Sequence, residues 1–565
     1  MQDMRQSLYL LLSWLCVSLC LSLPALAAAD LGYQLELDLD AETSTLRGKA
    51  TISYLYQGPK ALPSLFFRLD ANAQASMEVQ EVKTKEGLIL PSRPYRYTYL
   101  EQQVDDPLLY EVFLTEPLQP GQRVELVFHY VIRHLPRNQG AYYLLDDINQ
   151  LGLGSWYPRL VPFRDGQWQI YERLYADYEV KARANRKFYV ISPLAPVSIS
   201  NADHSYQYST EQAREMSLIY TPDMLLRSVE ADNVAIRYYY HANLQKWSPM
   251  TLELVQSVMR FLRERYGSYP SRRMTIVSIE DSPYPVIVSD QLIVLRNSFS
   301  PDADEAVVKR RLAEHLAYGL AQQFWGYQVG QPADKLAWIN QGLALFVAQH
   351  YLQQQERRPF LLGDALVEDY LRAARQGWNT SLDTPRQQLE RLRLDSFRAL
   401  AQGKGFTLIR QLERLLGKQV MEQTENRLLQ QFRGKQMQVA DFQKVLQQVS
   451  GKDLDWFFRQ WVQRSDTLDY AIQSAQQTQL ESGGVRAVVV VQKLGQITMP
   501  VTLALRLNNG ETQLKLWDGS QLSERLSFDL KHPLREVVID PSQATPDIDR
   551  SNNRFELPGM QAVRP

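Results

Sequence analysis

The spacing of apolar residues changes twice along this 565-residue chain, and these changes limit the folds available to it. Residues 33–40 read Y-Q-L-E-L-D-L-D, a period of two that indicates a strand with one buried and one solvated face. Strand-like stretches continue to about residue 232, helical spacing dominates residues 233–465, and alternation returns from residue 466. The pattern predicts a multi-domain α+β protein: an N-terminal antiparallel β domain, a mostly helical middle domain and a small C-terminal β domain.

These changes of period set the expected domain boundaries. We place an N-terminal β-sheet domain at residues 30–232, a middle domain at 233–465 and a C-terminal β-sandwich-like domain at 466–565. Within the middle domain, apolar spacing predicts helices at 250–266, 305–325, 336–354, 406–416 and 456–462, and strands at 274–279 and 292–295.

Local turn and cap residues sharpen this prediction at two places. Asp302 is the expected N-cap of the helix at 305–325, and Gly326 its expected C-cap. In the last domain, Asn509-Gly510 predicts a hairpin between strands at 501–507 and 513–517.

The first 29 residues resemble an export signal. Arg5 precedes an almost unbroken apolar run at residues 8–23, Pro24 ends that run, and residues 25–27 read A-L-A, the small residues that a signal peptidase needs. We therefore expect a signal peptide at residues 1–29. The alternative is a signal that is kept as a membrane anchor.

Composition limits the location and the partners of the mature protein. Both cysteines, Cys16 and Cys20, lie in the expected signal peptide, so stability must come from hydrophobic cores rather than disulfides. No later stretch approaches the ~20 apolar residues of a membrane span. A formal net charge of -1 supplies no basic field for nucleic acid. We expect a periplasmic or secreted protein with Gram-negative-type export, no nucleic-acid partner and no transmembrane span after signal removal.

Two segments of the middle domain carry the most informative motif. Residues 314–326 read E-H-L-A-Y-G-L-A-Q-Q-F-W-G, and residues 338–347 read W-I-N-Q-G-L-A-L-F-V. Together they resemble the core of the gluzincin aminopeptidases, the aminopeptidase N-like family that includes the leukotriene hydrolases. In that family, a helix with H-E-x-x-H, an aromatic pair and Gly precedes a helix that opens with W-x-N-E-G. The resemblance implies a thermolysin-like middle domain.

The resemblance also implies a chemistry for this spacing. Two His residues four apart share one helix face and can bind one zinc ion. The Glu of the second helix, after eighteen intervening residues, is the third ligand, and the Glu between the two His is the general base for zinc-bound water.

This chain keeps the frame of the motif but not its functional residues. Tyr318 and Gln322 stand at the two His positions, with eighteen residues between Gln322 and Gln341. Gly319 stands at the position of the general base, and Gln341 at that of the third ligand. We therefore expect no zinc or other cofactor at these degenerate positions.

Two other functional segments of the family are also altered. The Y-x-K-G motif, whose Tyr stabilises the oxyanion in the family, reads Q-G-K-G at residues 402–405, so Gln402 replaces the Tyr. The G-x-M-E-N loop, whose Glu binds the substrate's amino group, corresponds to residues 282–295. Val288 falls at that Glu, and Asp290 is the only carboxylate of the run.

The replacements have a physical interpretation. Without zinc, a buried Glu would be an uncompensated charge, which is costly. Neutral Gln322 and Gln341 can hydrogen-bond each other and the Tyr318 hydroxyl, and so fill the space without charge.

Two other groups of residues in the sequence could in principle hold a metal ion. A shifted site would begin from Glu314 and His315, but His350, nine residues after Gln341, falls on the opposite side of its helix. Oxygen-rich spacing near the C-terminus hints at calcium, although such clusters are usually turns; these residues are Asp547, Asp549, Asn552 and Asn553.

The sequence thus favours a non-catalytic homologue of these metallopeptidases, retaining the fold as a binding or scaffolding protein in the bacterial envelope. Its partner would be a peptide or an envelope protein. The alternative is an active zinc-dependent aminopeptidase acting on peptides. No two of the seven His residues are four apart, and no Ser lies in a G-x-S-x-G elbow, so neither zinc nor serine hydrolysis finds its motif.

Overall fold

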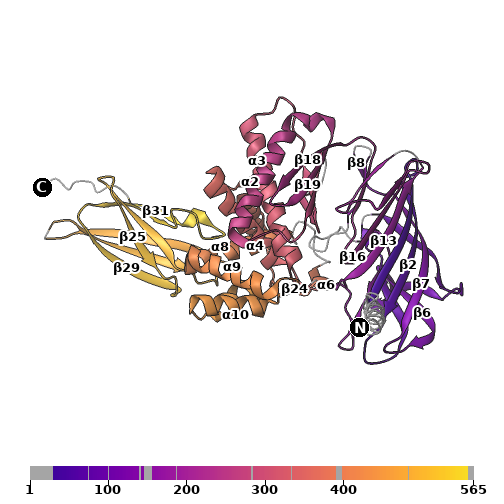
Figure 1. Ribbon diagram of the computed structural model, residues 1–565. Coiled ribbons are helices and arrows are strands. Elements are labelled where there is room, and N and C mark those ends of the chain that lie inside the picture. The colour runs from indigo at the N-terminus through magenta and orange to yellow at the C-terminus, as the bar shows by residue number, and fades with distance from the viewer. Residues whose placement is uncertain are drawn as a thin grey trace, which may run out of the picture.

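A computed structural model describes ten segments of the chain, in which three parts follow one another in space as they do in sequence (Figure 1). The expected signal peptide, residues 1–29, lies outside the described residues. Among the described residues, no helix has both the length and the apolar character needed to cross a bilayer. The described segments are 30–73, 75–99, 101–138, 141–145, 155–185, 188–280, 284–332, 334–389, 398–481 and 483–557.

The N-terminal part is built on a seven-stranded sheet, in the order β15-β16-β13-β1-β2-β7-β4. Tyr33, Leu35 and Leu37 of β1 are buried and their neighbours are more exposed, which confirms the alternation read from the sequence. β1 pairs in parallel with β13, and the other neighbours are antiparallel. The strands are β1 (Leu31–Asp40), β2 (Thr45–Leu55), β4 (Ser76–Thr84), β7 (Arg123–Arg133), β13 (Ala176–Ala184), β15 (Ser198–Ser200) and β16 (Ser205–Ala213).

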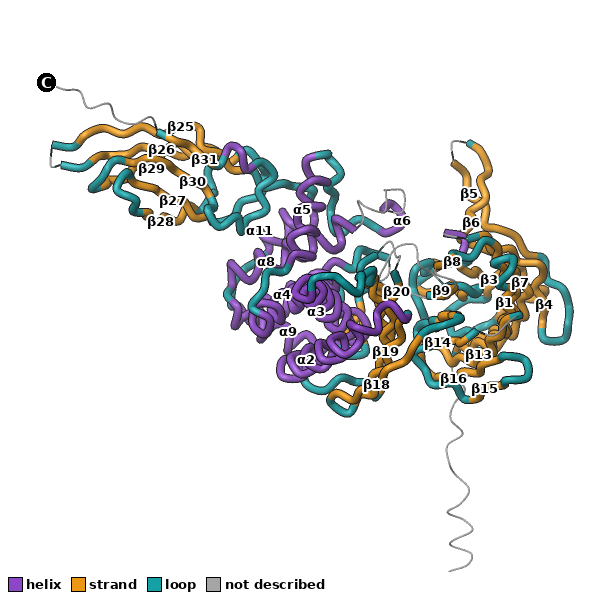
Figure 2. The backbone as a smooth tube through the Cα atoms, turned by 90° about the horizontal axis from the view of Figure 1, so that it is seen from above, coloured by secondary structure: helices purple, strands orange, loops and turns teal. Residues whose placement is uncertain are grey.

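Smaller sheets complete this part, and β5 and β6 extend away from it as a ribbon (Figure 2). One four-stranded sheet has the order β10-β3-β6-β5: β10 (Arg159–Val161), β3 (Leu62–Arg68), β6 (Gln102–Leu118) and β5 (Ser92–Tyr99). The other has the order β14-β17-β9-β8: β14 (Tyr189–Ile191), β17 (Leu218–Thr221), β9 (Ala141–Leu144) and β8 (Arg137–Asn138). A short hairpin joins β11 (Phe163–Arg164) to β12 (Gln167–Trp168), and η1 (Asp70–Ala73) is a single 3₁₀ turn.

The middle part packs helices against a five-stranded sheet, in the order β18-β19-β20-β22-β21. β18 pairs with β19, so this sheet begins at Leu225, before residue 233 where the spacing of apolar residues changes. Its strands are β18 (Leu225–Ala231), β19 (Val234–Tyr240), β20 (Arg273–Ile279), β21 (Val286–Ser289) and β22 (Leu292–Arg296). Its first helices are η2 (Ala242–Trp247), α2 (Ser248–Tyr266), α3 (Glu305–Gln322), η3 (Gln323–Gln328), α4 (Trp338–Tyr351) and η4 (Leu352–Glu356).

The remaining elements of the middle part include a two-stranded parallel ribbon, β23 with β24. These elements are β23 (Val329–Gly330), α5 (Leu361–Arg375), α6 (Arg386–Leu389), η5 (Ala399–Lys404), α8 (Gly405–Leu416), α9 (Lys418–Phe432), β24 (Lys435–Gln436), α10 (Val439–Ser450), α11 (Asp455–Phe458) and η6 (Arg459–Gln463).

The ends of α3 differ from the sequence prediction. Asp304, not Asp302, is the N-cap: its extended backbone lets the carboxylate accept from the N–H groups of Ala306 and Val307 at 2.8 and 3.2 Å. Gly326 does not end the helix, because the chain continues as the π-turn η3 with Trp325 in a non-helical conformation. Both predicted caps were therefore wrong. At the N-terminus, Asp302 and Asp304 are both suitable residues, and the backbone path decides which one caps the helix.

The C-terminal part is a pair of facing sheets, β25-β26-β29 and β28-β27-β30-β31. The predicted hairpin is confirmed: β27 and β28 pair through a turn at Gly510, whose φ of 88° suits a residue without a Cβ. The elements are β25 (Tyr470–Gln479), β26 (Val485–Lys493), β27 (Val501–Leu507), β28 (Thr512–Trp517), β29 (Ser523–Leu530), β30 (Leu534–Ile539), η7 (Arg550–Asn552) and β31 (Arg554–Glu556).

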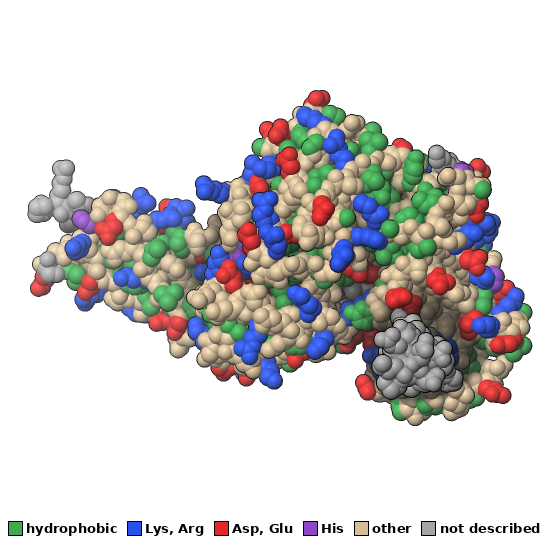
Figure 3. Space-filling model, viewed as in Figure 1, with side chains coloured by type: hydrophobic (Ala, Val, Ile, Leu, Met, Phe, Trp, Pro, Cys, Tyr) green, Lys and Arg blue, Asp and Glu red, His purple; other side chains and the backbone are tan. Residues whose placement is uncertain are grey.

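The three parts contact one another through specific residues. Ile191 and Ile219 of the N-terminal sheets share a small apolar cluster with Val277, Ile287 and Val294 of the five-stranded sheet. At the other end, one apolar core runs from the middle part into the C-terminal sheets, and Gln411 Nε2 donates to the carbonyl of Ala544 at 2.9 Å. On the face in Figure 3, basic and acidic side chains are interspersed over the three parts, in keeping with the net charge of -1.

Candidate functional site: a buried amide and hydroxyl cluster

Three elements of the middle part bring the motif residues together. α3 carries Tyr318 and Gln322, α4 carries Gln341, and η5 carries Gln402. α4 approaches η5 and α8 closely because glycine stands on both sides of the contact, Gly342 in α4 and Gly405 at the start of α8. A Cβ added at Gly342 would lie 2.7 Å from the carbonyl oxygen of Gly405, where only glycine fits.

The side chains at the four positions form one hydrogen-bonded cluster, which we call the amide cluster: Tyr318, Gln322, Gln341 and Gln402. The Tyr318 hydroxyl donates to Gln341 Oε1, and Gln322 Nε2 donates to the same oxygen at 2.8 Å. Gln322 Nε2 also donates to Tyr318 Oη at 2.6 Å. These contacts confirm the predicted hydrogen bonding among the three residues.

Gln402 was not part of that prediction, yet it belongs to the same cluster. Its Nε2 donates to Tyr318 Oη at 2.8 Å and to Gln341 Oε1 at 3.1 Å. On its other side, Arg398 Nε donates to Gln402 Oε1 at 3.1 Å. The residue at the Tyr position of Y-x-K-G thus links the cluster to a half-buried guanidinium, a contact for which the sequence offered no signal.

Burial makes these hydrogen bonds matter. Tyr318, Gln322 and Gln341 are only 3%, 1% and 2% exposed, so water cannot replace a lost partner. Every member is neutral, and one polar atom, Gln322 Oε1, is buried without a hydrogen-bond partner. The cluster is therefore nearly satisfied by its own members.

These side chains do not fit a zinc ion. Zinc sites in proteins use His nitrogen, Cys sulfur or carboxylate oxygen, whereas this cluster offers one phenol and three amides. Two of the amides, Gln322 and Gln402, direct their N–H groups at the shared oxygens, and such donors repel a cation. Among the described residues, no group of three or more His, Cys, Asp or Glu side chains is arranged to hold a metal ion.

Gly319, at the position of the general base, faces the five-stranded sheet. A Cβ there would lie 3.0 Å from Ile293 Cγ2 and 3.3 Å from Val286 Cγ1. A longer side chain would have to push one of these neighbours aside. The absence of a side chain at Gly319 thus accompanies close packing of α3 on β21 and β22.

The residues considered for a shifted metal site have other partners. Glu314 accepts from the backbone N–H of Leu361 at 2.9 Å, and burial raises the pKa of Glu314. Burial, with Arg311 nearby, lowers the pKa of His315 to about 3, so this histidine is neutral at physiological pH. His350 Nε2 lies 2.9 Å from Glu413 Oε1. The structure does not bring these groups together.

The edge strand expected to bind a substrate's amino group is β21, which contains Val288 at the border of its sheet. Its backbone is already bonded: the Tyr327 hydroxyl donates to the carbonyl of Val288 at 2.7 Å, and Gln323 Nε2 to that of Ser289 at 2.9 Å. Burial raises the pKa of Asp290, the nearby carboxylate. Sequence reasoning did not anticipate that the π-turn after α3 would contact this edge.

The oxygen-rich run near the C-terminus is occupied by its own turn. Asp547 Oδ2 accepts from the backbone N–H of Tyr470 and from Asn553 Nδ2, both at 3.0 Å. Asp547 Oδ1 accepts from the backbone N–H of Asp549 at 3.0 Å. These contacts match the interpretation of the run as a turn rather than a calcium loop.

A comparison with protein families decides what the middle part is. Residues 250–461 match the Peptidase family M1 domain. The match lies within the predicted middle domain and covers both helices of the amide cluster, so the gluzincin resemblance is confirmed for this domain. A search among curated proteins finds no match to the chain. The helical middle of the molecule, flanked by strands on both sides, has the multi-domain layout expected for an M1 domain.

Proposed function

We propose that this chain is an exported M1-domain protein that does not hydrolyse peptides and serves instead as a binding or scaffolding protein of the bacterial envelope. The observation that carries the proposal is the amide cluster. At the four positions where the family resemblance expects ligands and an oxyanion donor, neutral side chains bond one another in a buried site. A site that is filled by its own residues has no place for an activated water molecule.

Two further contacts support the proposal. Gly319 supplies no carboxylate to act as a general base, and its surroundings are packed. The bonded carbonyl of Val288 on the edge strand leaves one less acceptor for a bound peptide backbone. The retained role would therefore use another surface, with a peptide or an envelope protein as the partner.

The test combines metal analysis with an activity assay. We expect purified mature protein to contain well under one zinc per chain and to release no fluorophore from aminoacyl-fluorophore substrates, with or without added zinc. The control is a variant with the family residues restored: Tyr318→His, Gly319→Glu, Gln322→His, Gln341→Glu and Gln402→Tyr. One tightly bound zinc per unaltered chain, together with chelator-sensitive turnover, would establish the alternative, an active zinc-dependent aminopeptidase.

Export is tested separately. We expect the mature chain in the periplasmic or culture fraction, with an N-terminus that begins after residues 25–29 when it is read by mass spectrometry. An intact Met1 in the membrane fraction would identify an uncleaved anchor instead.

A further inference from the structure

A hollow lies at the boundary between the N-terminal part and the M1 domain, away from the amide cluster. It is a groove of about 830 Å³, a size typical of ligand sites. One wall comes from the N-terminal strands and their loops, and the other from Gly434, Lys435 and Gln436. Figure 1 shows the two elements involved, the end of β16 and the short strand β24, at this boundary.

Two cations that have no ion pair among the described residues line this groove, Arg214 and Lys435. The Arg214 guanidinium stacks on the ring of Tyr175 at 4.5 Å, and Arg214 Nε is buried without a hydrogen-bond partner. A Cβ added at Gly330 would lie 3.1 Å from Arg214 Nη1 and 3.7 Å from the carbonyl oxygen of Lys435. Arg214 thus reaches from the N-terminal part to the β23–β24 ribbon. Lys435 is exposed on that ribbon.

The other charges of the groove are already engaged or lie among its N-terminal residues. Arg164 pairs with Glu172 at 2.5 Å. Asp30 accepts from Gln57 Nε2 at 3.2 Å, and Asp165 lies in the β11–β12 turn. The unpaired positive charge is therefore concentrated beside β24, where the M1 domain forms the wall.

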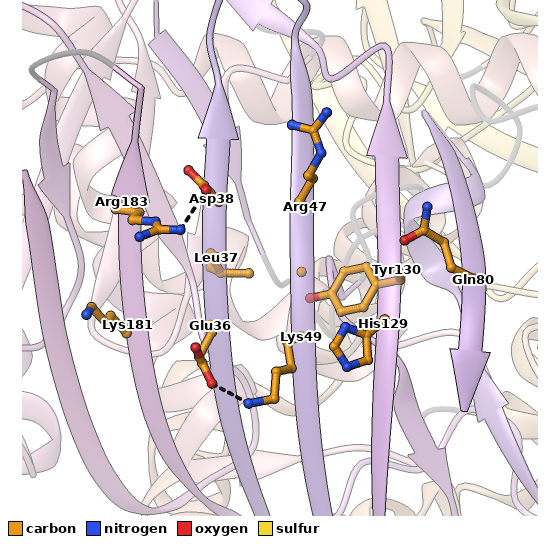
Figure 4. A pocket seen from close by; sticks show the side chains of 11 residues that line it. Glu36, Leu37, Asp38, Arg47, Lys49, Gln80, His129, Tyr130, Lys181 and Arg183 are labelled. Atoms are coloured by element: carbon orange, nitrogen blue, oxygen red, sulfur yellow. Dashed lines mark hydrogen bonds and ion pairs between the residues drawn. The ribbon is translucent and has the colours of Figure 1, made fainter. Parts of the chain in front are cut away.

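A second polar hollow contains cations that pair with carboxylates on neighbouring strands, although Arg47, which also lines it, forms no ion pair among the described residues. The pocket of about 290 Å³ on the seven-stranded sheet has cations too, but Lys49 pairs with Glu36 at 2.7 Å and Arg183 with Asp38 at 2.9 Å (Figure 4). These pairs neutralise one another across neighbouring strands, as is usual on a solvated sheet face. Among the described residues, Arg214 and Lys435 have no carboxylate at ion-pair distance, although Arg214 lies near enough to the carboxyl of Asp290 to oppose the rise in its pKa.

The wall beside these cations also has backbone groups at a strand edge. β24 pairs only with β23, so its other edge has no neighbouring strand among the described residues. An open edge can take an added extended chain through main-chain hydrogen bonds, and a guanidinium binds a carboxylate with two parallel bonds. Tyr175, 41% exposed, adds an aromatic surface in the same groove.

We propose that this groove binds an extended acidic peptide segment, with carboxylates at Arg214 and Lys435 and its backbone along the open edge of β24. The site joins the N-terminal part to the M1 domain, so its occupant would contact both. This binding does not depend on the loss of hydrolysis at the amide cluster, and either proposal can fail alone.

Fluorescence anisotropy with the full mature chain tests the proposal. The probe is an acetylated, amidated, fluorescein-labelled peptide of four Val–Asp repeats, and its uncharged counterpart has Val–Asn repeats. We expect the Val–Asp peptide to bind more tightly, and Arg214→Gln with Lys435→Gln to raise its Kd about ten-fold, the loss expected for charge-assisted contacts. Binding should weaken as salt rises from about 0.05 to 0.5 M.

The controls separate this site from general attraction. Arg47→Gln with Lys515→Gln removes two exposed cations elsewhere and should leave the Kd unchanged. Lys435→Gln alone, at an exposed position, should raise the Kd without lowering the melting temperature. Equal binding of the two peptides, or equal losses in both double variants, would overturn the proposal. Binding of inorganic phosphate, with no binding of either peptide, would also overturn it by indicating a site for small anions only.

Discussion

Two buried polar clusters of the M1 domain keep polar side chains in the interior in opposite ways, one without charge and one with a matched ion pair. The amide cluster is neutral throughout. The second, which we call the carboxylate cluster, joins Arg265, Tyr266 and Glu425: Arg265 Nε and Nη2 donate to the two oxygens of Glu425 at 2.8 and 3.0 Å. Tyr266 Oη adds a third bond to Glu425 at 2.5 Å. Glu425 is 0% exposed, and the Arg265 guanidinium faces it with two parallel hydrogen bonds.

The contrast indicates that a buried site without a bound ion must either pair its charges or use neutral side chains. A carboxylate is tolerated in the interior only with a dedicated counter-charge. Among the described residues, the cation that bonds to the amide cluster is Arg398, and it reaches only the outer oxygen of Gln402. Glutamine at position 341 keeps the shape of a glutamate and removes the charge. Substitutions in the two clusters test this contrast between a charged and a neutral interior site.

Glu425→Ala should be the most damaging change. It leaves the Arg265 guanidinium buried without its carboxylate, which costs about 3–5 kcal/mol in the free energy of unfolding. Urea denaturation followed by circular dichroism measures the loss. The control is Glu422→Gln: Glu422 is 38% exposed and 3.1 Å from Arg265, so its removal should cost under about 1 kcal/mol. Equal losses in both variants would contradict the special role of Glu425.

Gln341→Glu should destabilise the protein by about 2 kcal/mol or more at pH 7, because it buries a carboxylate without a cation. The loss should shrink as the pH falls, since protonation makes the new side chain neutral again. Thermal melting at pH 7 and pH 5 compares the two states. Gln354→Glu, an exposed change in η4, the segment that directly follows α4, is the control and should be close to neutral. A higher melting temperature for Gln341→Glu would show that the cluster tolerates charge.

Lys404 is a buried basic residue that, unlike Arg265, hydrogen-bonds to a neutral group: its Nζ donates to the carbonyl of Thr380 at 3.0 Å. Burial lowers the pKa of Lys404 to about 7. The unfolded chain therefore binds more protons than the folded one between pH 7 and the ordinary lysine pKa of about 10.4. Stability should accordingly rise with pH in that window, by up to about 1.4 kcal/mol per pH unit.

The variant that isolates this effect is Lys404→Met. Urea denaturation at pH 7, 8 and 9 should give a flatter pH dependence for this variant than for the unaltered protein. A similar slope in both proteins would assign the pH dependence to other groups.

Tyr318→Phe should have the smallest effect of the four. It removes the hydroxyl that accepts from Gln322 and Gln402, but both amides keep their hydrogen bond to Gln341 Oε1, so the loss should be about 1 kcal/mol. The double variant with Gln402→Leu should lose less than the sum of the two single variants, because the Tyr318–Gln402 hydrogen bond is already lost in either single variant. A double-variant cycle on unfolding free energies measures this coupling. Strictly additive losses would mean that the two side chains do not act as one cluster.

Much of the fold could be predicted from the sequence because periodicity records which faces are buried. The period of two at residues 33–40 gave β1, and the hairpin at Gly510 followed from Asn509-Gly510. The caps of α3 could not be predicted, because Asp302 and Asp304 are both suitable residues and the backbone conformation chooses between them.

The amide cluster, too, was predictable from the sequence only in part. The spacing of Tyr318, Gln322 and Gln341 determined that these side chains would meet, since helical geometry fixes their faces and the match to the M1 domain fixes the partner helix. That Gln402 would complete the cluster, and that Tyr327 would bond the edge strand, was decided only by the approach of η5 and by the π-turn after α3.

The groove at Arg214 and Lys435 belongs wholly to the tertiary structure. Its two cations are more than two hundred residues apart in sequence and neither lies in a motif. Local sequence therefore determines the elements and the residues that each element carries. The tertiary structure alone decides which charged side chains come together at this groove. Their proximity depends on how the N-terminal strands lie against the M1 domain.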